Sequence, residues 1–358
     1  PRSTLFPYTT LFRSELDKII ATDIVQIIPD TRKNEIIAFI REGLQDFSIS
    51  RPAERLKGWG IPVPNDPSQI IYVWFDALVN YISALGYGTD VDLLFRRFWP
   101  ANLHVIGKGI IRFHAVYWLA MLLSAGLPIP KKIFVHGYVT VENQKMSKSL
   151  GNMVDPHALC HKFGVDTLRY ALISTISPFN DGNFSEHALI DRNNQDLVGV
   201  VGNFCYRTLS FIDRFFKGVI PPFSMLHADT HTLDQEIADV ANRVKAQLDQ
   251  CKLRDALQEI VGLAAVGNKY FQEHAPWVSI KNDIPAARNV LGACAELCRV
   301  LCLFLHPFIP RFAKDLWQQL GTTEPLEKCT WGDIHHRGKV KGQRIITPTP
   351  LIKKIMDK

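Results

Sequence analysis

The spacing of apolar residues changes along the chain, and this change limits the folds that the chain can adopt. Between residues 70 and 141, strand-like runs of β-branched and aromatic residues alternate with helical segments that end at glycine. Strands are expected at 70–75 (IIYVWF), at 102–109 with its loop (NLHVIGKG) and at 131–141 (KKIFVHGYVTV). Such alternation is typical of a parallel α/β sheet. From residue 191 to about 317 the spacing is almost wholly helical, which predicts an antiparallel helical bundle.

The segments before residue 70 carry weaker signals. Residues 1–14 (PRSTLFPYTTLFRS) repeat the string TLF and keep no helix or strand period. We therefore expect a foreign segment and exclude it from the fold, with a disordered native tail as the alternative. A short amphipathic helix is expected at 34–45, and the Pro- and Gly-rich stretch 58–69 predicts turns and extended chain. A buried helix is expected at 110–126.

The composition excludes several classes of protein. Hydrophobic residues make up 47% of the 358 residues and the net charge is +6, which permits a polyanionic partner without requiring one. The seven cysteines form no CxxC pair, so a disulfide framework or a zinc knuckle is not expected, and a reducing, cytoplasmic compartment is favoured. Cys294, Cys298 and Cys302 follow one helix stripe and suit core packing. No apolar run reaches the ~18 residues of a membrane span.

The segment 143–152 (NQKMSKSLGN) predicts an anion-binding loop. It follows the third expected strand, and a parallel sheet binds its ligand at the carboxyl ends of its strands. Lys145 and Lys148 supply point charges, while Ser147 and Ser149 supply hydrogen bonds. The chain has no GxxxxGK[ST] string, and GKGIIR at 107–112 lacks the third glycine of GxGxxG. The residues thus indicate a mobile loop for a triphosphate, with a solvated surface loop as the alternative.

The same loop resembles the KMSKS signature of class I aminoacyl-tRNA synthetases. The strings EGLQDFSISR, GWGIPVP, YVWFDALVNYISALGYG, HVIGKGIIRFHAVYW, VHGYVTVENQKMSKSLGN and HAPW narrow the resemblance to methionyl-tRNA synthetases, in the order and spacing of that family. The resemblance covers roughly residues 15–355. It implies ATP-dependent activation of L-methionine to methionyl-adenylate and its transfer to tRNA(Met), with Mg²⁺ as partner of the nucleotide and a monomer as the favoured state.

Two aromatic stripes suit the amino-acid side chain. One helix face carries residues spaced i, i+3 and i+7, which are Trp74, Ala77 and Tyr81. A face of the next helix carries residues spaced i, i+4 and i+8, which are Ile110, His114 and Trp118. From the residues alone, ordinary core packing is the favoured interpretation of both stripes. The resemblance assigns them to methionine, whose polarisable thioether prefers aromatic surroundings. Leu78 stands where many family members have proline, and Asp76 is a candidate to cap or orient that helix.

The resemblance also implies the nucleotide site. It places Gly107 and Lys108 near the ribose and phosphates, His136 and Gly137 near the adenosine, and Arg51 close by. Lys145, Ser147, Lys148 and Ser149 would hold the triphosphate, and the two lysines would stabilise the charge that develops in the transition state. Family members usually carry an acidic residue at the position of Gly109, so a weaker affinity for the nucleotide is expected here.

The resemblance implies a second ATP motif, HIGH, and a zinc knuckle upstream, and this chain contains neither. The chain is therefore expected to be the C-terminal portion of an enzyme and inactive by itself. The expected parts are a foreign segment (1–14), the tail of an inserted connective domain (15–68) and the second half of a Rossmann-like catalytic domain (69–145). These are followed by the KMSKS loop and stem-contact region (146–190), the helical anticodon-binding domain (191–335) and a C-terminal tail (336–358).

The helical region contains residue types that read unpaired bases. Asn203 and Arg207 lie four apart on one face, and Pro276-Trp277 breaks a helix. Asn, Arg and Trp hydrogen-bond to base edges or stack on bases, and these positions match the family's anticodon contacts. From the residues alone, a capping Asn and a packed Trp are the alternative.

Other interpretations stay open at this point. A non-catalytic tRNA-binding protein would keep the bundle and would have no use for the lysine pair. Another class I synthetase, for Leu, Ile, Val or Cys, is disfavoured by the aromatic pocket and the HAPW string. His157 and His161 have metal-ligand spacing, but no HExxH string and no third ligand accompany them, so a helix-surface pair and no metal site is expected.

Overall fold

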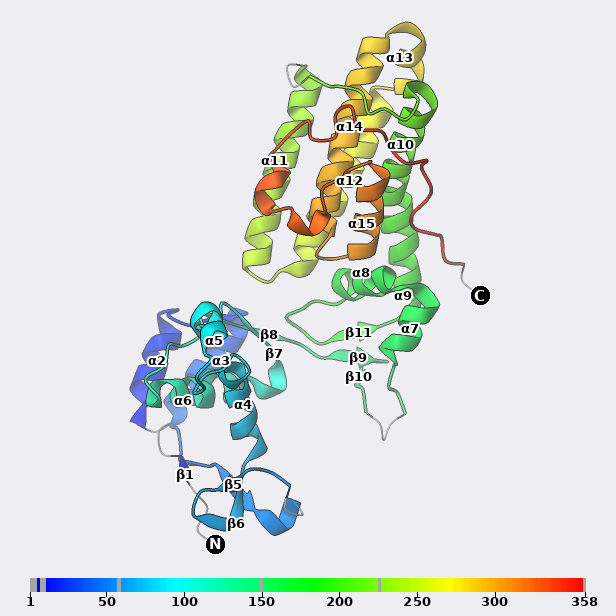
Figure 1. The fold of residues 1–358 in the computed structure, drawn as a ribbon. Helices are drawn as coiled ribbons and strands as arrows, with labels where there is room; N and C mark the ends of the chain where they lie inside the picture. The colour runs from blue at the N-terminus through cyan, green and yellow to red at the C-terminus, as the bar shows by residue number, and fades with distance from the viewer. Residues whose placement is uncertain (1–4, 7–10, 57–58, 148–150, 225–226, 357–358) are drawn as a thin grey trace. The chain divides into compact units, whose positions relative to one another are not determined.

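The computed structural model describes residues 5–6, 11–56, 59–147, 151–224 and 227–356. The chain divides into two compact units, Pro1–Tyr138 and Val139–Lys358, and each is described by itself (Figure 1). The predicted fold class is confirmed, because the first unit contains a parallel sheet and the second contains a large helical region. Among the helices in the described residues, none has the length and apolarity needed to cross a bilayer.

The parallel sheet of the first unit has three strands in the order β2-β8-β7. They are β2 (Gln26–Ile28), β8 (Lys132–His136) and β7 (His104–Gly107), with Gly107 opposite His136 in the register. Both β7 and β8 therefore end at the same edge, where the following loops begin. The strand β2 lies in the segment 15–68 and was not predicted from the sequence.

Helices pack against this sheet because their apolar stripes match its buried strands. In α3, Ile36 and Ile40 are fully buried and join Ile133 of β8 in one core. The helix ends at Gly43, whose φ of +118° suits only glycine. The helical segments of the first unit are α2 (Arg13–Ala21), α3 (Asp30–Glu42), η1 (Ala53–Leu56), α4 (Val73–Ser83), α5 (Leu93–Phe98), η2 (Lys108–Ile110), the π-helical η3 (Phe113–Trp118) and α6 (Leu119–Ser124).

The predicted strand at 70–75 is wrong in two respects. The strand β6 (Asp66–Ile71) ends before Tyr72, and α4 begins at Val73. In addition, β6 belongs to an antiparallel sheet with β4 (Ser50–Pro52) and β5 (Pro62–Val63), not to the parallel sheet. A short apolar run cannot be assigned to strand or helix by periodicity alone, which explains the error.

The predicted third strand at 131–141 is likewise two strands in two sheets. After β8 ends at His136, β9 (Val139–Val141) pairs with β10 (Gln144–Lys145) and β11 (Gly182–Phe184) in the second unit. Glu142 and Asn143 have positive φ values of 52° and 60°, as a tight hairpin turn requires. The segment 143–152 therefore begins in the turn after β9 and includes β10, and its predicted place directly beyond a strand of the parallel sheet β2-β8-β7 is wrong.

Residues 1–14 were expected to lie outside the fold, but the described part of this segment contacts the first unit. The strand β1 (Leu5–Phe6) pairs with β3 (Phe47–Ser48), and α2 begins at Arg13. The Arg13 Nε atom donates a hydrogen bond to the Ile40 carbonyl at 3.0 Å. These residues therefore contribute to the first unit.

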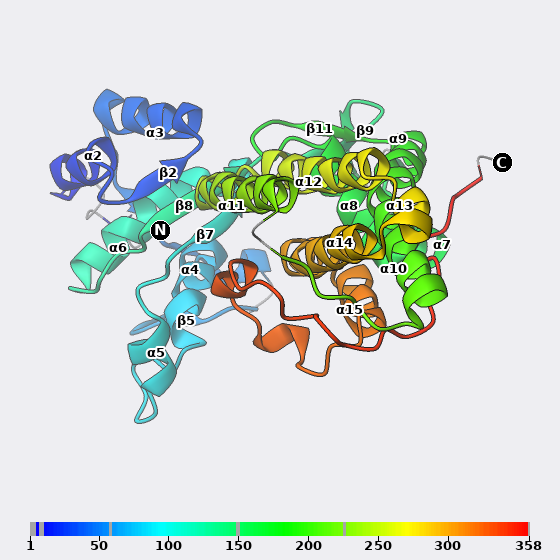
Figure 2. The ribbon, with the colours of Figure 1, turned by 90° about the horizontal axis from the view of Figure 1, so that it is seen from above.

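The second unit is built around a helical bundle, as predicted. Helices α10, α11, α12 and α14 lie side by side, and Figure 2 shows the same neighbours from above. Asp155 and Asp283 cap α7 and α14 by accepting backbone N–H groups. The helical segments are α7 (Pro156–Phe163), α8 (Val165–Thr175), α9 (Glu186–Arg192), the π-helical η5 (Asn193–Gly202), α10 (Asn203–Phe216), α11 (Ala228–Asp249), α12 (Leu253–Glu273), α13 (Pro276–Asn282), α14 (Ile284–Leu305), α15 (Pro310–Gln319), η6 (Leu326–Lys328) and η7 (Trp331–Ile334).

The core of the bundle is apolar, with one ion pair inside it. Cys294, Cys298 and Cys302 are fully buried, which confirms the prediction of core packing, and burial raises the pKa of all three thiols. The Arg299 Nε atom donates to Glu296 at 2.6 Å, and each side chain is only 2% exposed. Such a pair costs desolvation energy, so it is weak evidence for added stability.

The C-terminal tail packs back on the bundle, as expected. Val219 and Arg344 form an isolated antiparallel bridge. Further along, the Asn193 amide donates to the Lys353 carbonyl at 3.0 Å, and the Asn194 amide donates to the Ile355 carbonyl at 2.8 Å. The side chains of η5 therefore hold the last residues of the described chain.

Two glycines of α12 give a matched test of the bundle packing. A Cβ atom at Gly267 would lie 2.7 Å from both Leu297 and Phe204, whereas a Cβ atom at Gly262 would meet nothing within 4 Å. We expect Gly267→Ala to lower the free energy of unfolding by about 1–3 kcal/mol through overpacking. Gly262→Ala should raise it by up to about 1 kcal/mol through helix propensity. Urea titrations followed by far-UV circular dichroism measure both, and equal midpoints for the two variants would contradict the packing.

Candidate functional site

The first unit carries a cluster of aromatic side chains around a hydrogen bond between Tyr81 and His114. Tyr81 lies on α4 and His114 lies on the π-helical segment η3, and their Oη and Nε2 atoms are 2.9 Å apart. The Trp118 ring, one turn further along η3, lies 6.0 Å from the Tyr81 ring. π-Helical segments often occur at functional sites. The structure thus brings together three of the six residues predicted to hold the amino-acid side chain.

The hydrogen bonds define which atom carries each proton. The Nδ1 atom of His114 lies 3.0 Å from the carbonyl oxygen of Ile110, which can only accept. Nδ1 therefore carries the proton in the neutral ring, and Nε2 accepts the proton of the Tyr81 hydroxyl. Burial lowers the pKa of His114, because it disfavours the charged imidazolium. Tyr81 and His114 are therefore neutral, and the donors of both side chains are already engaged.

A second histidine, His104, lies in the same cluster and was missed from the sequence. It is the first residue of β7 and is 4% exposed, and its Nε2 atom accepts the indole N–H of Trp118 at 3.3 Å. Its ring lies 4.3 Å from the Tyr81 ring. Burial, and next the neighbouring His114, lower the pKa of His104 to about 4. Its position as an inward-facing residue of a strand that carries other site residues was the available signal.

Of the other three residues predicted to hold the amino-acid side chain, Trp74 and Ala77 lie on α4 and Ile110 ends η2. Trp74 is 37% exposed and stacks on Phe113 at 5.0 Å rather than on Tyr81. Ala77 is exposed on the same helix, and Ile110 is half-buried. Asp76 forms no cap, because Tyr72 is the N-cap residue of α4 and no side chain caps that helix.

Arg51 lies on β4 in the first unit. Its guanidinium is 3.8 Å from the centre of the Tyr72 ring and donates to the Ser50 carbonyl at 2.7 Å. The Tyr72 ring in turn contacts Phe47, which stacks on Tyr117 at 4.5 Å. Arg51 is therefore held by a cation–π contact and by backbone acceptors beside the aromatic residues.

The carboxyl ends of β7 and β8 bring the predicted nucleotide residues of the first unit together. Gly107 and His136 are paired in the register, and a Cβ atom at Gly107 would lie 3.6 Å from the His136 ring. The Lys108 ammonium lies 4.8 Å from the centre of the Tyr138 ring. A Cβ atom at Gly109 would lie close to the Tyr138 hydroxyl, so this phenol fills the space beside Gly109. The carboxyl edge of β7 and β8 thus brings together an ammonium group, an imidazole and a phenol, beside a backbone that carries no side chain at Gly107 and Gly109.

The described part of the lysine loop is held by Asn152 in the second unit. The Asn152 side chain accepts the Ser147 N–H at 2.8 Å and lies 3.4 Å from the Lys145 carbonyl. Lys145 is exposed. The remaining predicted loop residues, Lys148 and Ser149, lie outside the described residues.

The predicted anticodon residues gather on one face of the bundle. Asn203 donates to the Asn268 side chain at 3.2 Å, and Arg207 donates to the Gln272 side chain at 3.4 Å, which links α10 to α12. The Arg207 guanidinium lies 4.7 Å from the Phe271 ring centre, and the Phe271 ring lies 6.1 Å from Trp277.

Pro276 is buried at the start of α13 and places Trp277 beside that face. Trp277 is half-buried and packs against the core of the bundle. Part of the Trp277 side chain is packed, as the alternative interpretation expected, and the rest of it is accessible to solvent.

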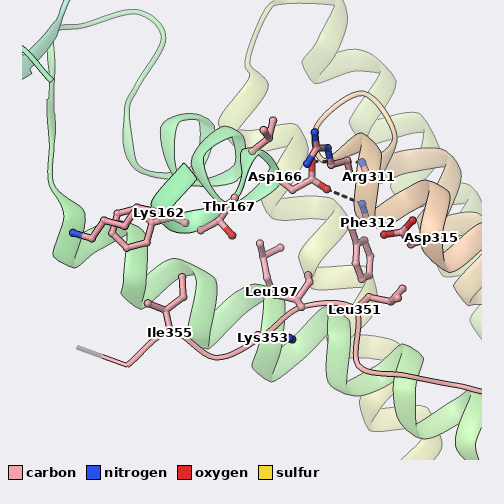
Figure 3. A pocket seen from close by; sticks show the side chains of 14 residues that line it. Lys162, Asp166, Thr167, Leu197, Arg311, Phe312, Asp315, Leu351, Lys353 and Ile355 are labelled. Atoms are coloured by element: carbon pink, nitrogen blue, oxygen red, sulfur yellow. Dashed lines mark hydrogen bonds between the residues drawn. The ribbon is translucent and has the colours of Figure 1, made fainter. Parts of the chain in front are cut away.

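The second unit also contains a cavity of about 400 Å³ that no predicted residue lines. It lies between α7, α8, the start of α15 and the C-terminal tail (Figure 3). The Asp166 carboxylate accepts the Phe312 N–H at 2.6 Å and so caps α15. Lys162, Arg311 and Lys353 add positive charge to an otherwise mixed lining. Because basic, acidic and apolar side chains all line the cavity, its chemistry favours no particular class of ligand.

The two histidines with metal-ligand spacing, His157 and His161, lie on α7. His157 and His161 are both exposed, and the described residues contain no cluster of three or more His, Cys, Asp or Glu side chains that could hold a metal ion.

Comparison with known families agrees with this geometry. Residues 3–209 match the family described as tRNA synthetases class I (M), and residues 220–358 match the anticodon binding domain of methionyl tRNA ligase. The structure is similar to Mycobacterium tuberculosis methionyl-tRNA synthetase in complex with methionyl-adenylate. The TM-score is 0.91 at 35% identity, covering 98% of this chain and 69% of that one.

Curated relatives support the same family. The methionine–tRNA ligase of Caldanaerobacter subterraneus is 42% identical over 331 residues, covering 90% of this chain and 51% of the relative. That of Brucella suis is 41% identical over 332 residues, covering 92% of this chain and 63% of the relative. The chain therefore belongs to the methionyl-tRNA synthetase family of class I tRNA synthetases. It spans about half to two thirds of the length of these two relatives.

The buried histidines predict a pH-dependent stability of the first unit. The folded state keeps His104 unprotonated down to pH about 4, whereas an unfolded histidine takes up a proton below about 6.5. Stability is therefore fully present above pH 6.5 and is lost as the pH falls toward 4, by about 3 kcal/mol at most. Urea unfolding followed by the tryptophan fluorescence measures this loss.

His104→Asn should flatten that pH dependence. His187→Asn, which replaces an exposed histidine of α9, should leave it unchanged. An identical acid sensitivity in the wild type and His104→Asn would show that His104 does not cause it.

Proposed function

We propose that this chain provides the methionine slot, part of the nucleotide site and the anticodon-binding region of a methionine–tRNA ligase. The observation that carries the proposal is the slot formed by Tyr81, His114 and Trp118 in a chain of this family. The relatives' names assign methionine–tRNA ligase activity to those proteins. The proposal extends the activity to the protein that contains this chain.

The slot has the chemistry to hold the methionine side chain. A thioether is apolar and polarisable, and it gains favourable contacts with the edges and faces of aromatic rings. Trp74, Tyr81 and Trp118 supply such rings, and Ala77 and Ile110 would leave room for an unbranched chain. His114 orients the Tyr81 hydroxyl by accepting its proton.

The nucleotide is proposed to lie over the carboxyl edge of the parallel sheet. Gly107 permits close approach, Lys108 is a cation for the phosphates, and His136 with Gly137 would face the adenosine. Arg51 adds a further cation. From the second unit, Lys145 and Ser147, together with Lys148 and Ser149, are proposed to act on the triphosphate.

The proposed reaction has two steps. The methionine carboxylate attacks the α-phosphate of ATP, and pyrophosphate leaves, which gives methionyl-adenylate. The terminal adenosine of tRNA(Met) then takes the methionyl group. Lys145 and Lys148 would stabilise the negative charge that grows on the phosphates, and Mg²⁺ would neutralise part of it.

The proposed division of the chain into parts follows the boundaries expected from the sequence. Residues 69–145 would be the second half of the catalytic domain, and 15–68 the end of an inserted domain. Residues 146–190 would contact the tRNA stem, 191–335 would bind the anticodon, and 336–358 would form the tail. Residues 1–14 would be foreign in origin.

Replacement of Lys145 tests the catalytic proposal. The chain is joined to the part of the Mycobacterium tuberculosis synthetase that it does not match, so that a complete protein is assayed. Lys145→Ala should lower kcat for methionine-dependent ATP–pyrophosphate exchange by about 100-fold, because the charge it meets develops in the transition state. The KM for methionine should change by less than about threefold.

Lys131→Ala is the matched control, since Lys131 is exposed and precedes β8. A Lys145→Ala effect confined to the KM for methionine would contradict the assigned role.

The anticodon proposal can be tested on this chain as it stands. Asn203 and Arg207 would meet base edges, and Trp277 would stack on a base, which is worth ~1–3 kcal/mol. We expect micromolar binding of an RNA hairpin with a CAU loop and weaker binding of a scrambled loop, both decreasing with salt. Fluorescence anisotropy with Trp277→Leu, which keeps an apolar side chain against the core, should lose most of the difference between the loops.

Tyr206→Ala serves as the control, because Tyr206 is 41% exposed on α10 and belongs to no proposed contact. Equal binding of both loops by the wild type would remove the anticodon assignment.

A second candidate function is a tRNA-binding protein without catalysis. The polar face of α10 and α12 would serve it equally well. It gives no reason for a buried neutral slot in the first unit. Exchange activity of the completed protein decides between the two functions.

A further inference from the structure

His104 is a buried polar group whose position needs an explanation. It is 4% exposed, and its neighbours are aromatic: Tyr81 at 4.3 Å, Trp99 at 6.1 Å and His114 at 6.1 Å between ring centres. Burying a polar ring among apolar groups costs free energy unless its hydrogen bonds are satisfied. A phenylalanine would fill the same space without that cost.

The hydrogen bond from Trp118 supplies the explanation. The Trp118 side chain is 1% exposed, so its indole N–H cannot reach water. The Nε2 atom of His104 accepts this N–H at 3.3 Å. Without an acceptor at this place, the N–H would be buried and unsatisfied, and the indole would be free to turn.

His104 also packs against the Tyr81 ring, with the ring centres 4.3 Å apart. Its ring is tilted by 50° against the Tyr81 ring, whose hydroxyl donates to His114. One imidazole therefore touches both rings that face the proposed methionine side chain. The two contacts come from different elements, since Tyr81 lies on α4 and Trp118 on η3.

We propose that His104 is a positioning residue of the methionine slot, which fixes the Trp118 indole by accepting its N–H and the Tyr81 ring by packing beneath it. This inference rests on the proposed function, because the slot is assigned to methionine there. His104 itself need not touch the substrate. It acts on methionine affinity through the two rings.

The role requires an unprotonated Nε2 atom, because an imidazolium has no acceptor. Among the described residues, the titratable groups recorded against His104 are His114 on η3 and Tyr81 on α4; Trp99 and Trp118 do not titrate. Burial keeps His104 neutral at ordinary pH. Methionine affinity is therefore expected to fall when His104 takes up its proton.

The experiment measures methionine binding to the full chain by NMR. Saturable shifts of the Trp118 indole N–H and of the histidine ring nitrogens give the dissociation constant. His104→Leu removes the acceptor and should weaken binding about tenfold or more, while His104→Gln, which keeps an acceptor, should stay within about threefold of the wild type. In a Trp118→Phe background, where no N–H needs an acceptor, His104→Leu should change affinity by less than about threefold.

A pH titration of the wild type supplies a second, independent readout. The Trp118 N–H shift and the methionine affinity should both change with the midpoint of the His104 ring nitrogens, which NMR separates from those of His114. His187→Asn should leave both curves unchanged. This readout also holds if His104→Leu fails to fold.

The outcomes separate this inference from the proposed function. If the wild-type chain shows no saturable methionine shifts, the slot assignment fails and the inference fails with it. If the wild type binds methionine and a folded His104→Leu binds equally well, only the role of His104 is overturned. Methionine affinity that stays constant while His104 titrates would overturn it too.

Discussion

The parallel pairing of β7 with β8 is the interaction on which the first unit depends. The register from His104 opposite Ile133 to Gly107 opposite His136 fixes both ends of β7 at once. At the amino end, it places His104 under the aromatic slot. At the carboxyl end, it places the Lys108 loop beside His136. A slip of one residue would turn His104 outward and leave the buried Trp118 N–H without this acceptor, so one register sets both the aromatic cluster and the edge.

In the proposed methionine slot, a polar network would line a site for an apolar side chain. Its N–H and O–H donors are used within the protein, from Trp118 to His104, from Tyr81 to His114 and from His114 to a backbone carbonyl. The rings are thereby held in fixed orientations and stay uncharged. A thioether loses no hydrogen bond on entering such a slot, whereas a charged side chain would lose its hydration.

The sequence predicted much of this arrangement, and its errors have physical causes. Helix periodicity placed Tyr81 on one stripe and His114 with Trp118 on another, and the family resemblance, not the spacing, assigned both stripes to one slot. His104 is not on a helix face, so helix periodicity could not indicate it. Its place depends on where β7 begins and on its contacts with Trp118 and Tyr81. The strand predicted at 70–75 failed because its partner is β4, which only the folded chain reveals. The run 131–141 was divided because β9 pairs with β11, more than 40 residues later. Asn268 and Gln272 were missed for the same reason, because they act through contacts between α10 and α12.

The amino-acid dependence of ATP–pyrophosphate exchange tests the central claim most directly. The completed protein is assayed with methionine and, separately, with leucine, isoleucine, valine and cysteine at equal concentrations. The account predicts that methionine gives the highest kcat/KM, by at least about 100-fold over each of the others, because an unbranched thioether fills a neutral aromatic slot. A higher kcat/KM with any of the other four amino acids would contradict the assignment of the slot formed by Tyr81, His114 and Trp118.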